Sequence, residues 1–504
     1  MSAYEIIFLG SSPNALAAAA RLSRAGRRVL VLETREALGG PVATEDFAPG
    51  FRADAGVMSA ALDPEVTRDL GVSIDILRRD SITALGPSPA TWRAAPPLPE
   101  AVARAVELLG AIYRTTPSAM PSAAGAAAGS AVLQGGSGLG VRHPLHAIGA
   151  RLLGLGPREM HEVLRLLFMP ARDFAGEQPG ASSAERAILC AAAVRGISEG
   201  PFAPGTLFNF LHREAVGDGL FPSTARGGLR SLAQALADKA RAHGAEVRAG
   251  VTGPLSIAIE DRTARGVLLG DGERIAADIV VSDFDARVTF TRLVPAYELD
   301  PEVNRAIRST RYRGSVARVH LALRGLPEFT GVDREALRGT LVVAPDVASL
   351  ERAWDQAKRG VVPSFPIIEA KLPSVSDPSF APEGHHVLSA WVQYVPYGCG
   401  DREALLQTVV ERLASFAPGL ADRVLHYEVS LPEDLERRFS LTEGHLYGGE
   451  INLAQSFFLR PIPGYSHYES PIGNLYLGGS AAHPGGYSGL CGWNLAGALL
   501  ARTA

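Results

Sequence analysis

A glycine-containing turn near the start of the sequence, followed by an acidic residue, has the spacing of a dinucleotide site. The turn is Gly10-Ser11-Ser12-Pro13-Asn14-Ala15, and the acid is Glu33, followed by Thr34 and Arg35. Backbone N–H groups of such a turn, with the positive end of a following helix, can bind a pyrophosphate. An acid after the next strand can accept hydrogen bonds from ribose hydroxyls. Arg35 would then contact the adenosine or a phosphate as a bidentate donor.

Two positions of this turn depart from the usual Gly-x-Gly-x-x-Gly pattern. Ser12 and Ala15 stand where the second and third glycines are normally found. The second glycine lets the pyrophosphate approach the backbone, and the third lets the helix pack closely against the strand. The Ser12 hydroxyl would therefore either crowd a phosphate or donate a hydrogen bond to it, and both alternatives stay open.

A strand, a helix and a second strand are needed to position the turn and the acid. Residues 6–9 and 29–32 are apolar runs of strand length, and the alanine-rich residues 16–25 are typical of a helix. This order is that of a dinucleotide-binding βαβ unit.

Later segments show further periodicities. Apolar residues recur at helical spacing over residues 151–169, which predicts an amphipathic helix, and Gly270-Asp271-Gly272 predicts a hairpin. Polar and apolar residues alternate over 312–323 and 389–394, as in half-buried strands. Residues 117–140, rich in Ala, Gly and Ser, are interpreted as a loop. The helix positions expected to face the core or a channel are Leu152, Leu153, Leu164 or Leu167.

Further motifs, together with this βαβ unit, resemble the phytoene-desaturase-like branch of the FAD-dependent amine oxidase superfamily. They are Gly39-Gly40, Gly50-Phe51-Arg52-Ala53-Asp54-Ala55-Gly56, Phe221-Pro222 with residues 226–229, and residues 244–247, 277–282, 457–464 and 474–494. The similarity covers roughly residues 1–75, 205–330 and 440–504, whereas residues 76–205 match little of the family pattern. The resemblance implies an α/β fold, with a discontinuous Rossmann-type FAD-binding domain and an inserted α+β substrate domain.

The same resemblance implies FAD as cofactor and assigns residues beyond the first turn to it. Asp54 would border the flavin or its phosphates, or else cap a helix. The backbone of Val251 or of Gly253 would hold the adenine. The other residues assigned to FAD by their place in the motifs are Gly39, Gly40, Gly56, Gly479, Ser480, Gly489 and Leu490.

Two residues near the end of the sequence are candidates for contacts with the flavin or the substrate. His483 would act as an acid or base near neutral pH, or would fix its Pro-Gly-Gly turn, and we favour the structural role. Tyr487 would donate a hydrogen bond to the substrate or fill the wall of the cleft. No metal site is expected, because the histidines lack ligand spacing.

Composition narrows the class of protein. The 504 residues are 46% hydrophobic and 20% charged, as in globular proteins of two or three domains, and the net charge of −4 does not favour nucleic acid. The three cysteines, Cys190, Cys399 and Cys491, form no CxxC motif, and their odd number favours a reducing compartment. We expect a cytoplasmic protein with no leader and no membrane-spanning helix, although peripheral contact with a membrane would suit a lipophilic substrate.

The resemblance implies a division of the chain between cofactor and substrate. Residues 1–75, 221–295 and 440–504 would bind FAD, while 76–220 and 296–439 would form a cap, with an apolar channel between cap and flavin. The enzyme would dehydrogenate or rearrange a polyene- or isoprenoid-like substrate, with oxygen or a quinone as electron acceptor. One alternative is a natural-product tailoring flavoenzyme, which would act on a polyene as a cyclase or a reductase. Another is a scaffold or binding protein that has lost its cofactor. The sequence leaves the oligomeric state open.

Overall fold

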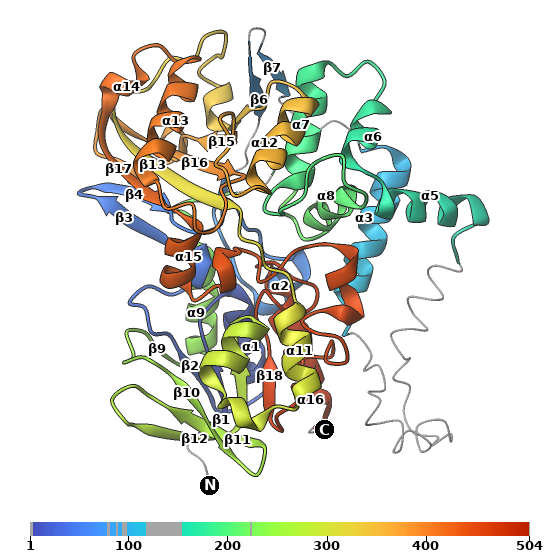
Figure 1. Ribbon diagram of the computed structural model, residues 1–504. Helices are drawn as coiled ribbons and strands as arrows, with labels where there is room; N and C mark the ends of the chain where they lie inside the picture. The colour runs from blue at the N-terminus through green and yellow to red at the C-terminus, as the bar shows by residue number, and fades with distance from the viewer. Residues whose placement is uncertain are drawn as a thin grey trace.

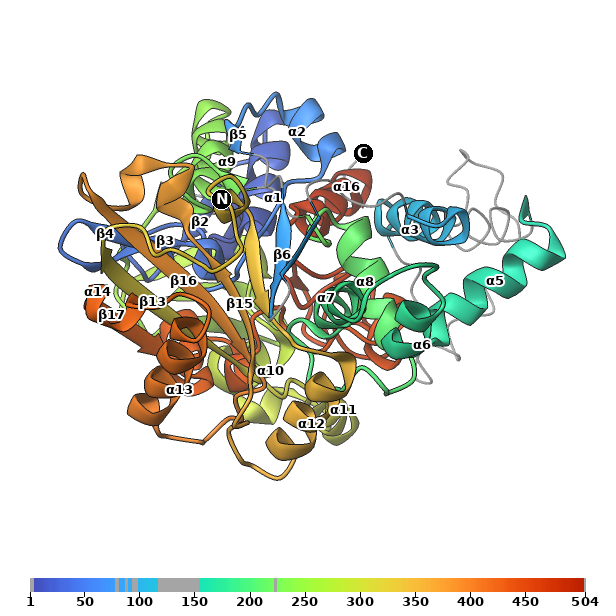
Figure 2. The same ribbon diagram turned by 90° about the horizontal axis from the view of Figure 1, so that it is seen from above.

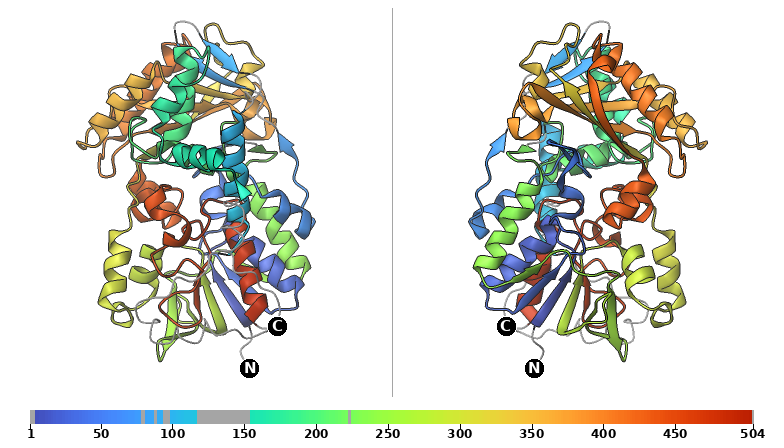
Figure 3. Two further views of the ribbon diagram at one scale, coloured as in Figure 1. Left: turned by 90° about the vertical axis from the view of Figure 1, so that its right-hand side faces the viewer. Right: turned by 90° about the vertical axis from the view of Figure 1, so that its left-hand side faces the viewer.

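The computed structural model describes residues 4–77, 81–86, 89–92, 98–116, 154–221 and 224–502. The segment 117–140, and Leu152 and Leu153, lie outside the described residues. Figure 1 shows two sheets, one in the lower and one in the upper part of the molecule, with a group of helices beside the upper sheet. Figure 3 shows the same two lobes from both sides.

The lower sheet combines strands from three distant parts of the chain. Its order is β10-β11-β12-β1-β2-β9. Strand β18 pairs with the carboxyl end of β12, on the edge opposite β1. The strands β9, β2, β1, β12 and β18 run parallel, and β10 and β11 extend the sheet in antiparallel fashion. Their bounds are β1 Tyr4–Leu9, β2 Val29–Leu32, β9 Glu246–Arg248, β10 Ser256–Glu260, β11 Thr263–Leu268, β12 Arg274–Ser282 and β18 Leu475–Leu477. The expected hairpin at Gly270-Asp271-Gly272 joins β11 to β12.

Alternating side chains of β1 enter two different hydrophobic clusters. Ile6 and Phe8 pack with the alanines of α1 (Pro13–Arg24) and with α9 (Arg230–Ala242), whereas Ile7 and Leu9 pack with residues such as Ile257 on the opposite face. Helix α16 (Leu490–Arg502) also packs on α1. The sheet is therefore covered on both faces, as its uninterrupted apolar strands require.

The upper sheet has the order β17-β13-β16-β15-β14-β6-β7. All neighbours are antiparallel except β14 and β6. The strands expected within 312–323 and 389–394 are present as β13 and β16, but the expectation that they are half-buried is wrong. Strand β13 is buried at every position but the last, and β16 at every position but the first two. One face packs with α13 (Arg402–Ala414) and the other contributes Trp391 to the main core. The strand bounds are β6 Ile82–Leu85, β7 Ala90–Trp92, β13 Val316–Arg324, β14 Thr340–Val343, β15 Ile367–Lys371, β16 His385–Gln393 and β17 Val424–Ser430.

A group of helices lies beside the upper sheet, as the view from above shows (Figure 2). Its members are α3 Glu100–Tyr113, α5 Pro157–Phe168, α6 Ala171–Gly176, α7 Ser183–Val194 and α8 Thr206–Ala215. The helix expected over 151–169 appears as α5, but the expected orientation of Leu164 is wrong. Leu164 is 46% exposed, whereas Val163 and Leu166 are buried, because α5 rests on α3 and α8 along a narrow stripe.

Short elements connect these layers. They are β3 Thr44–Ala48, β4 Phe51–Asp54, β5 Ile76–Leu77, β8 Thr224–Ala225, α2 Pro64–Leu70, α10 Ala286–Val288, α11 Pro301–Ser309, α12 Val347–Ala357, α14 Leu420–Arg423 and α15 Pro432–Phe439. In the described part of the chain, every helix is too short or too polar to cross a lipid bilayer.

Candidate functional site

The turn at the N-terminus of α1 is held by Ser12 and by an aspartate from a distant strand. The Ser12 hydroxyl accepts a hydrogen bond from Asn14 N at 3.2 Å, which makes Ser12 the N-cap of α1. The same hydroxyl donates to Asp283 Oδ1 at 2.6 Å, and Ser12 N donates to Asp283 Oδ2 at 2.7 Å. Gly10 has a φ of +105°, and a Cβ there would lie 2.8 Å from Asp283 Cβ. A glycine is therefore required where the turn meets Asp283.

Glu33 lies at the carboxyl end of β2, beside this turn. Its Oε2 accepts a hydrogen bond from Ser11 Oγ at 2.6 Å, and its Oε1 accepts one from Arg35 N at 3.0 Å. Ser11 Oγ also accepts from Gly39 N at 3.0 Å, so that the buried carboxylate connects the first turn to the Gly39-Gly40 turn. A carboxylate has about four acceptor positions. Glu33 thus keeps positions for the two hydroxyls of a ribose.

A cavity of about 160 Å³ brings many of the predicted residues together. Those that line it are Gly10, Ser11, Ser12, Glu33, Thr34, Arg35, Gly40, Ser480 and Tyr487. The Arg35 guanidinium lies over the Phe439 ring, bonds to Gly40 O at 3.0 Å and pairs with Glu45. The positive charge of Arg35 is therefore already paired with the carboxylate of Glu45.

Other predicted residues lie next to this cavity but outside its lining. Asn14 Nδ2 donates to Gly486 O at 2.9 Å, and Val251 N donates to Glu33 O at 3.1 Å. Asp54 Oδ1 accepts from Thr44 Oγ1 at 2.6 Å and from the N–H of Leu229, the residue before α9, at 3.0 Å. The remaining predicted residues outside the lining are Pro13, Ala15, Gly39, Gly56, Gly479, His483, Gly489 and Leu490.

Two of those glycines hold the backbone around the cavity in close contact. A Cβ on Gly56 would lie 2.2 Å from Pro41 O, and a Cβ on Gly479 would lie 1.9 Å from Asp283 O. Both positions therefore admit no side chain. These glycines shape the site by letting two backbone segments approach closely, and their own atoms do not line the cavity.

Sequence reasoning missed the cavity residues that follow β12 and those on α15. Those after β12 are Asp283, Phe284 and Asp285, and those on or directly after α15 are Arg437, Arg438, Phe439, Ser440 and Leu441; Pro41, next to Gly40, was missed as well. Asp283 comes directly after the apolar end of β12, whose Ser282 pairs with Leu9 at the end of β1. An acid directly after a buried strand was the available signal, because parallel strands end at the same edge of a sheet.

His483 is buried, with 2% of its surface exposed, against the end of α3. Its ring meets the Tyr113 ring edge-on at 5.8 Å, and its carbonyl accepts from Tyr468 Oη at 3.1 Å. Burial lowers the pKa of His483 to about 4, although the backbone of Ile112 and Thr115 partly offsets this effect. The imidazole is therefore neutral at pH 7 and cannot serve there as a cationic acid.

Tyr487 forms a wall shared by two cavities. It lines the cavity beside Glu33 and also a much smaller one, about 10 Å³, between α8 and the loop at Ser59. Its hydroxyl donates to Leu446 O at 2.7 Å and accepts from Ser480 Oγ at 3.3 Å. Burial raises the pKa of Tyr487, so the phenol stays protonated at neutral pH.

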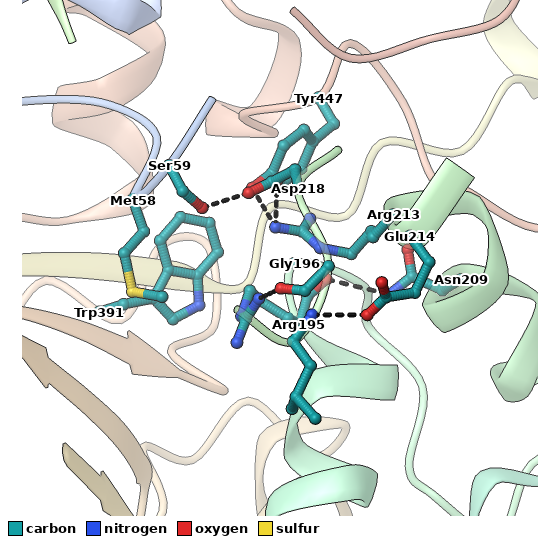
Figure 4. A network of polar contacts seen from close by, with 12 residues as sticks. Met58, Ser59, Arg195, Gly196, Asn209, Arg213, Glu214, Asp218, Trp391 and Tyr447 are labelled. Carbon is teal, nitrogen blue, oxygen red and sulfur yellow. Dashed lines mark hydrogen bonds and ion pairs between the residues drawn. The ribbon is translucent and has the colours of Figure 1, made fainter. Parts of the chain in front are cut away.

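The small cavity is lined by a buried polar cluster that we call the Arg213 cluster, made of Ser59, Arg213, Asp218 and Tyr447 (Figure 4). Arg213 Nη2 donates to Asp218 Oδ2 at 2.5 Å and to Tyr447 Oη at 2.9 Å, and Ser59 Oγ donates to Asp218 Oδ1. The sequence led us to expect an apolar channel beside the flavin. The wall next to Tyr487 instead carries a buried ion pair.

A second buried ion pair lies behind the Arg213 cluster. Arg195, at the end of α7, donates from Nε to Glu369 Oε1 at 2.9 Å and from Nη2 to Glu369 Oε2 at 2.6 Å. Its Nη1 donates to Gly219 O at 3.2 Å. Since the Arg195 and Glu369 side chains are 1% and 2% exposed, this bidentate pair joins the helices to β15 in a dry environment. Among the described residues, no group of three or more His, Cys, Asp or Glu is placed to hold a metal ion.

Comparisons with known proteins agree with this arrangement. The model of the family described as flavin containing amine oxidoreductase matches residues 16–492. The chain is 29% identical to pyridine nucleotide-disulfide oxidoreductase domain-containing protein 2 of Rattus norvegicus, over 96% of this chain and 90% of that one. It is 26% identical to a phytoene desaturase of Fusarium fujikuroi, over 56% of this chain and 52% of that one. The solved structure of putrescine oxidase bound to putrescine has the same fold, with a TM-score of 0.58, 16% identity and 99% of each chain covered.

Proposed function

Since the chain belongs to the flavin-containing amine oxidoreductase family and is therefore an FAD-dependent oxidoreductase, we propose that it dehydrogenates or rearranges a lipophilic, polyene- or isoprenoid-like substrate. FAD would be held with its adenosine ribose at Glu33, and its pyrophosphate at the turn from Gly10 to Ala15. The free acceptor positions of Glu33 and the glycine at the turn fit this cofactor. Membership of this family places the chain among enzymes rather than cofactor-free scaffolds.

In the proposed division of the chain, residues 1–75, 221–295 and 440–504 bind FAD, and residues 76–220 and 296–439 bind the substrate. Support comes from the two sheets. Strands β1, β2, β9 to β12 and β18 come from the first set of residues, and strands β6, β7 and β13 to β17 from the second.

One observation carries the substrate proposal: an apolar cavity lies among the helices, and one of its lining residues is close in sequence to a residue that lines the small cavity at Tyr487. An apolar cavity of about 220 Å³ lies among the helices and is lined by Leu220, among others. Asp218, two residues earlier, faces the small cavity of the Arg213 cluster, and Tyr487 joins that cavity to the one beside Glu33. The main apolar residues of the first cavity are Trp92, Leu98, Phe174, Leu189, Phe210 and Leu220. A lipophilic substrate would gain most of its affinity by burial there.

Bound FAD supplies the acceptor for the two electrons that leave the substrate. The residues of the chain exclude water and position the reacting carbon. Ser480 and Tyr487 close the wall between the cofactor and substrate cavities. Asp218, held by Arg213 and Ser59, is our candidate for receiving the proton that leaves with the hydride. We further propose that oxygen or a quinone reoxidises the flavin, and that a lipophilic substrate is taken up through peripheral contact with a membrane.

The Arg213 cluster favours a second candidate, a substrate with a polar or charged group. A buried ion pair beside Tyr487 would bind such a group more readily than a hydrocarbon. The solved putrescine oxidase carries a diamine as its bound ligand. The two candidates predict different reductants for the bound flavin.

We expect phytoene in detergent micelles to bleach the flavin absorbance near 450 nm, about the wavelength of any oxidised flavin, when mixed anaerobically with the FAD-loaded protein. Putrescine should leave that absorbance unchanged. Bleaching by putrescine alone would move the assignment to an amine substrate. Chromatography of the products then separates dehydrogenation from cyclisation or reduction of the polyene.

A matched pair of variants tests the apolar cavity. Leu98→Glu places a charge in its wall, and we expect the KM for phytoene to rise about tenfold or more, because burial of an unpaired charge is unfavourable. Leu164→Glu changes an exposed leucine outside the cavity lining and should leave KM unchanged. Equal KM values in both variants would contradict the proposal that the substrate binds in this cavity.

The ribose role of Glu33 has its own expected outcome. Glu33→Ala should weaken FAD binding by roughly 1.5–3 kcal/mol, the range for hydrogen bonds to a charged group. Glu36→Ala, three residues later and exposed, should have no effect. The dissociation constant is measured from the fluorescence of released FAD, and an unchanged constant in Glu33→Ala would exclude the ribose contact.

A further inference from the structure

Asp283 occupies the position at the start of α1 where an anion would bind. Its carboxylate accepts hydrogen bonds from Ser12 N and from Ser12 Oγ, at 2.7 and 2.6 Å. The next residue, Pro13, has no N–H, and Asn14 N already bonds to Ser12 Oγ. Of the N–H groups that a pyrophosphate would use, Ser12 N is thus bound to the protein's own carboxylate and Asn14 N to the Ser12 hydroxyl.

A pyrophosphate and an ionised Asp283 would repel each other at this place. Both would be negatively charged within one cavity, and Arg35, which also lines that cavity, pairs with Glu45 rather than with Asp283. Arg437 and Arg438, which line the cavity, pair with Asp434 and with Glu45 and Glu428. In the described part of the chain, Ser12 is the hydrogen-bond partner of the Asp283 carboxylate.

The titratable groups that face Asp283 do not relieve this repulsion. Glu33, after β2, contributes a further negative charge. Asp285, two residues after Asp283, accepts hydrogen bonds from Thr442 N, Thr442 Oγ1 and Val288 N. From the last part of the chain, Tyr487 and Cys491 face Asp283 as neutral groups, since burial raises the pKa of each. Burial raises the pKa of Asp283 to about 7, although the hydrogen bonds from Ser12 act in the opposite direction.

We propose that Asp283 is part of the FAD site and that it binds the cofactor as a neutral carboxylic acid, so that FAD binding takes up one proton from the solvent. The protonated oxygen then donates a hydrogen bond to a phosphate oxygen, and the repulsion between two anions is removed. The inference concerns the cofactor and does not depend on the identity of the substrate.

The sign of the pH dependence follows from proton linkage. The FAD-bound state holds one proton more than the free state, so affinity is highest where free Asp283 is already protonated, below about pH 7. Above that pH, each pH unit should weaken FAD binding about tenfold, until the pKa of Asp283 in the complex is reached. Because Asp283 is already half ionised at pH 7, the dissociation constant should rise by up to about fiftyfold between pH 7 and pH 9.

The experiment measures FAD release from the full-length holoprotein at pH 6, 7, 8 and 9. The protein is diluted to equilibrium, and the fluorescence of released FAD gives the dissociation constant at each pH. Calorimetric titration of the FAD-depleted protein at pH 8, in two buffers of different ionisation enthalpy, counts the protons taken up. We expect a steep rise of the constant above pH 7 and uptake of about one proton. A constant that varies less than threefold, with no proton uptake, would overturn the proposal.

Two variants assign the proton to a residue. Asp283→Asn keeps a neutral side chain that can donate a hydrogen bond, so its affinity should not depend on pH and should exceed the wild-type affinity at pH 9. Asp278→Asn, an exposed aspartate on β12, should keep the wild-type slope. A wild-type slope in Asp283→Asn would overturn the assignment. If that variant does not fold, proton uptake by the wild-type protein at pH 8 still decides between the outcomes.

Discussion

Replacing Arg195 by alanine is expected to lower the free energy of unfolding by about 3–5 kcal/mol. The change removes the three hydrogen bonds from Arg195 to Glu369 and the charge that pairs with it, and leaves that carboxylate buried, with 2% of its side chain exposed. The carbonyl of Gly219 also loses its donor. Urea denaturation at a fixed FAD concentration measures the loss, because bound cofactor stabilises the folded state by mass action.

The double variant Arg195→Met with Glu369→Leu separates the two contributions. Replacing both charges by apolar groups of similar volume leaves no unpaired charge and should recover most of the stability. An exposed ion pair gives the matched control. Arg104 and Glu100 have side chains 42% and 81% exposed, and Arg104→Ala should cost less than about 1 kcal/mol. A loss of that small size in Arg195→Ala would contradict the importance of the buried pair.

Gly492→Ala should destabilise the protein by about 3 kcal/mol, at the upper end of the range for overpacking. Gly492 lies in α16 where that helix crosses α1, and a Cβ there would lie 1.8 Å from Asn14 O and 2.6 Å from Asn14 C. Both neighbours are backbone atoms, so the helices must separate. Because Asn14 is next to the Ser12 turn, FAD affinity should fall together with the unfolding midpoint.

Another glycine of the same helix provides the control. A Cβ on Gly497 would lie 3.1 Å from Arg21 Nη1, the end of a flexible side chain that can move. Gly497→Ala should therefore be neutral, or stabilise the protein by up to about 1 kcal/mol through helix propensity. Thermal unfolding followed by circular dichroism compares the two variants. Equal midpoints would show that α1 and α16 are not in close contact at Gly492.

The first βαβ unit was predictable because its signals are local. The apolar runs at 6–9 and 29–32 appear as β1 and β2, on either side of the glycine turn. The helix begins at Pro13 rather than at Leu16, since Ser12 is an N-cap and Pro13 occupies the first helical position. That capping signal was present in the sequence and extends the helix by one turn.

Burial and long-range pairing were less predictable, because they depend on what lies opposite an element. The alternation over 312–323 is genuine, yet β13 is buried on both faces by α13 and by the main core. The helical spacing at Leu164 is also genuine, but α5 is covered only along Val163 and Leu166. In both cases, the period indicates the type of element and the tertiary neighbours decide which face is covered.

The same distinction applies to the site. The residues around the first turn and Glu33 lie within a short stretch, and their motif predicts them as a group. Asp283 reaches Ser12 from 271 residues away, through the register of β1 with β12, and no spacing within one motif indicates that contact. The Arg213 cluster is likewise assembled from separate segments, with Ser59 and Asp218 159 residues apart.

The three-part origin of the lower sheet has a consequence for the order in which the protein is made. Asn14 Nδ2 bonds to Gly486 O, 472 residues later, and α16 packs on α1. At translation rates of 5–20 residues per second, α1 waits roughly 20–100 s for these partners. During that time the alanine-rich face of α1 and one edge of β12 are uncovered on the nascent chain, while the strands of the upper sheet emerge. The cofactor turn can therefore take its final form only after residues 486–502 have been made, and until then the uncovered face of α1 is open to chaperones and to aggregation.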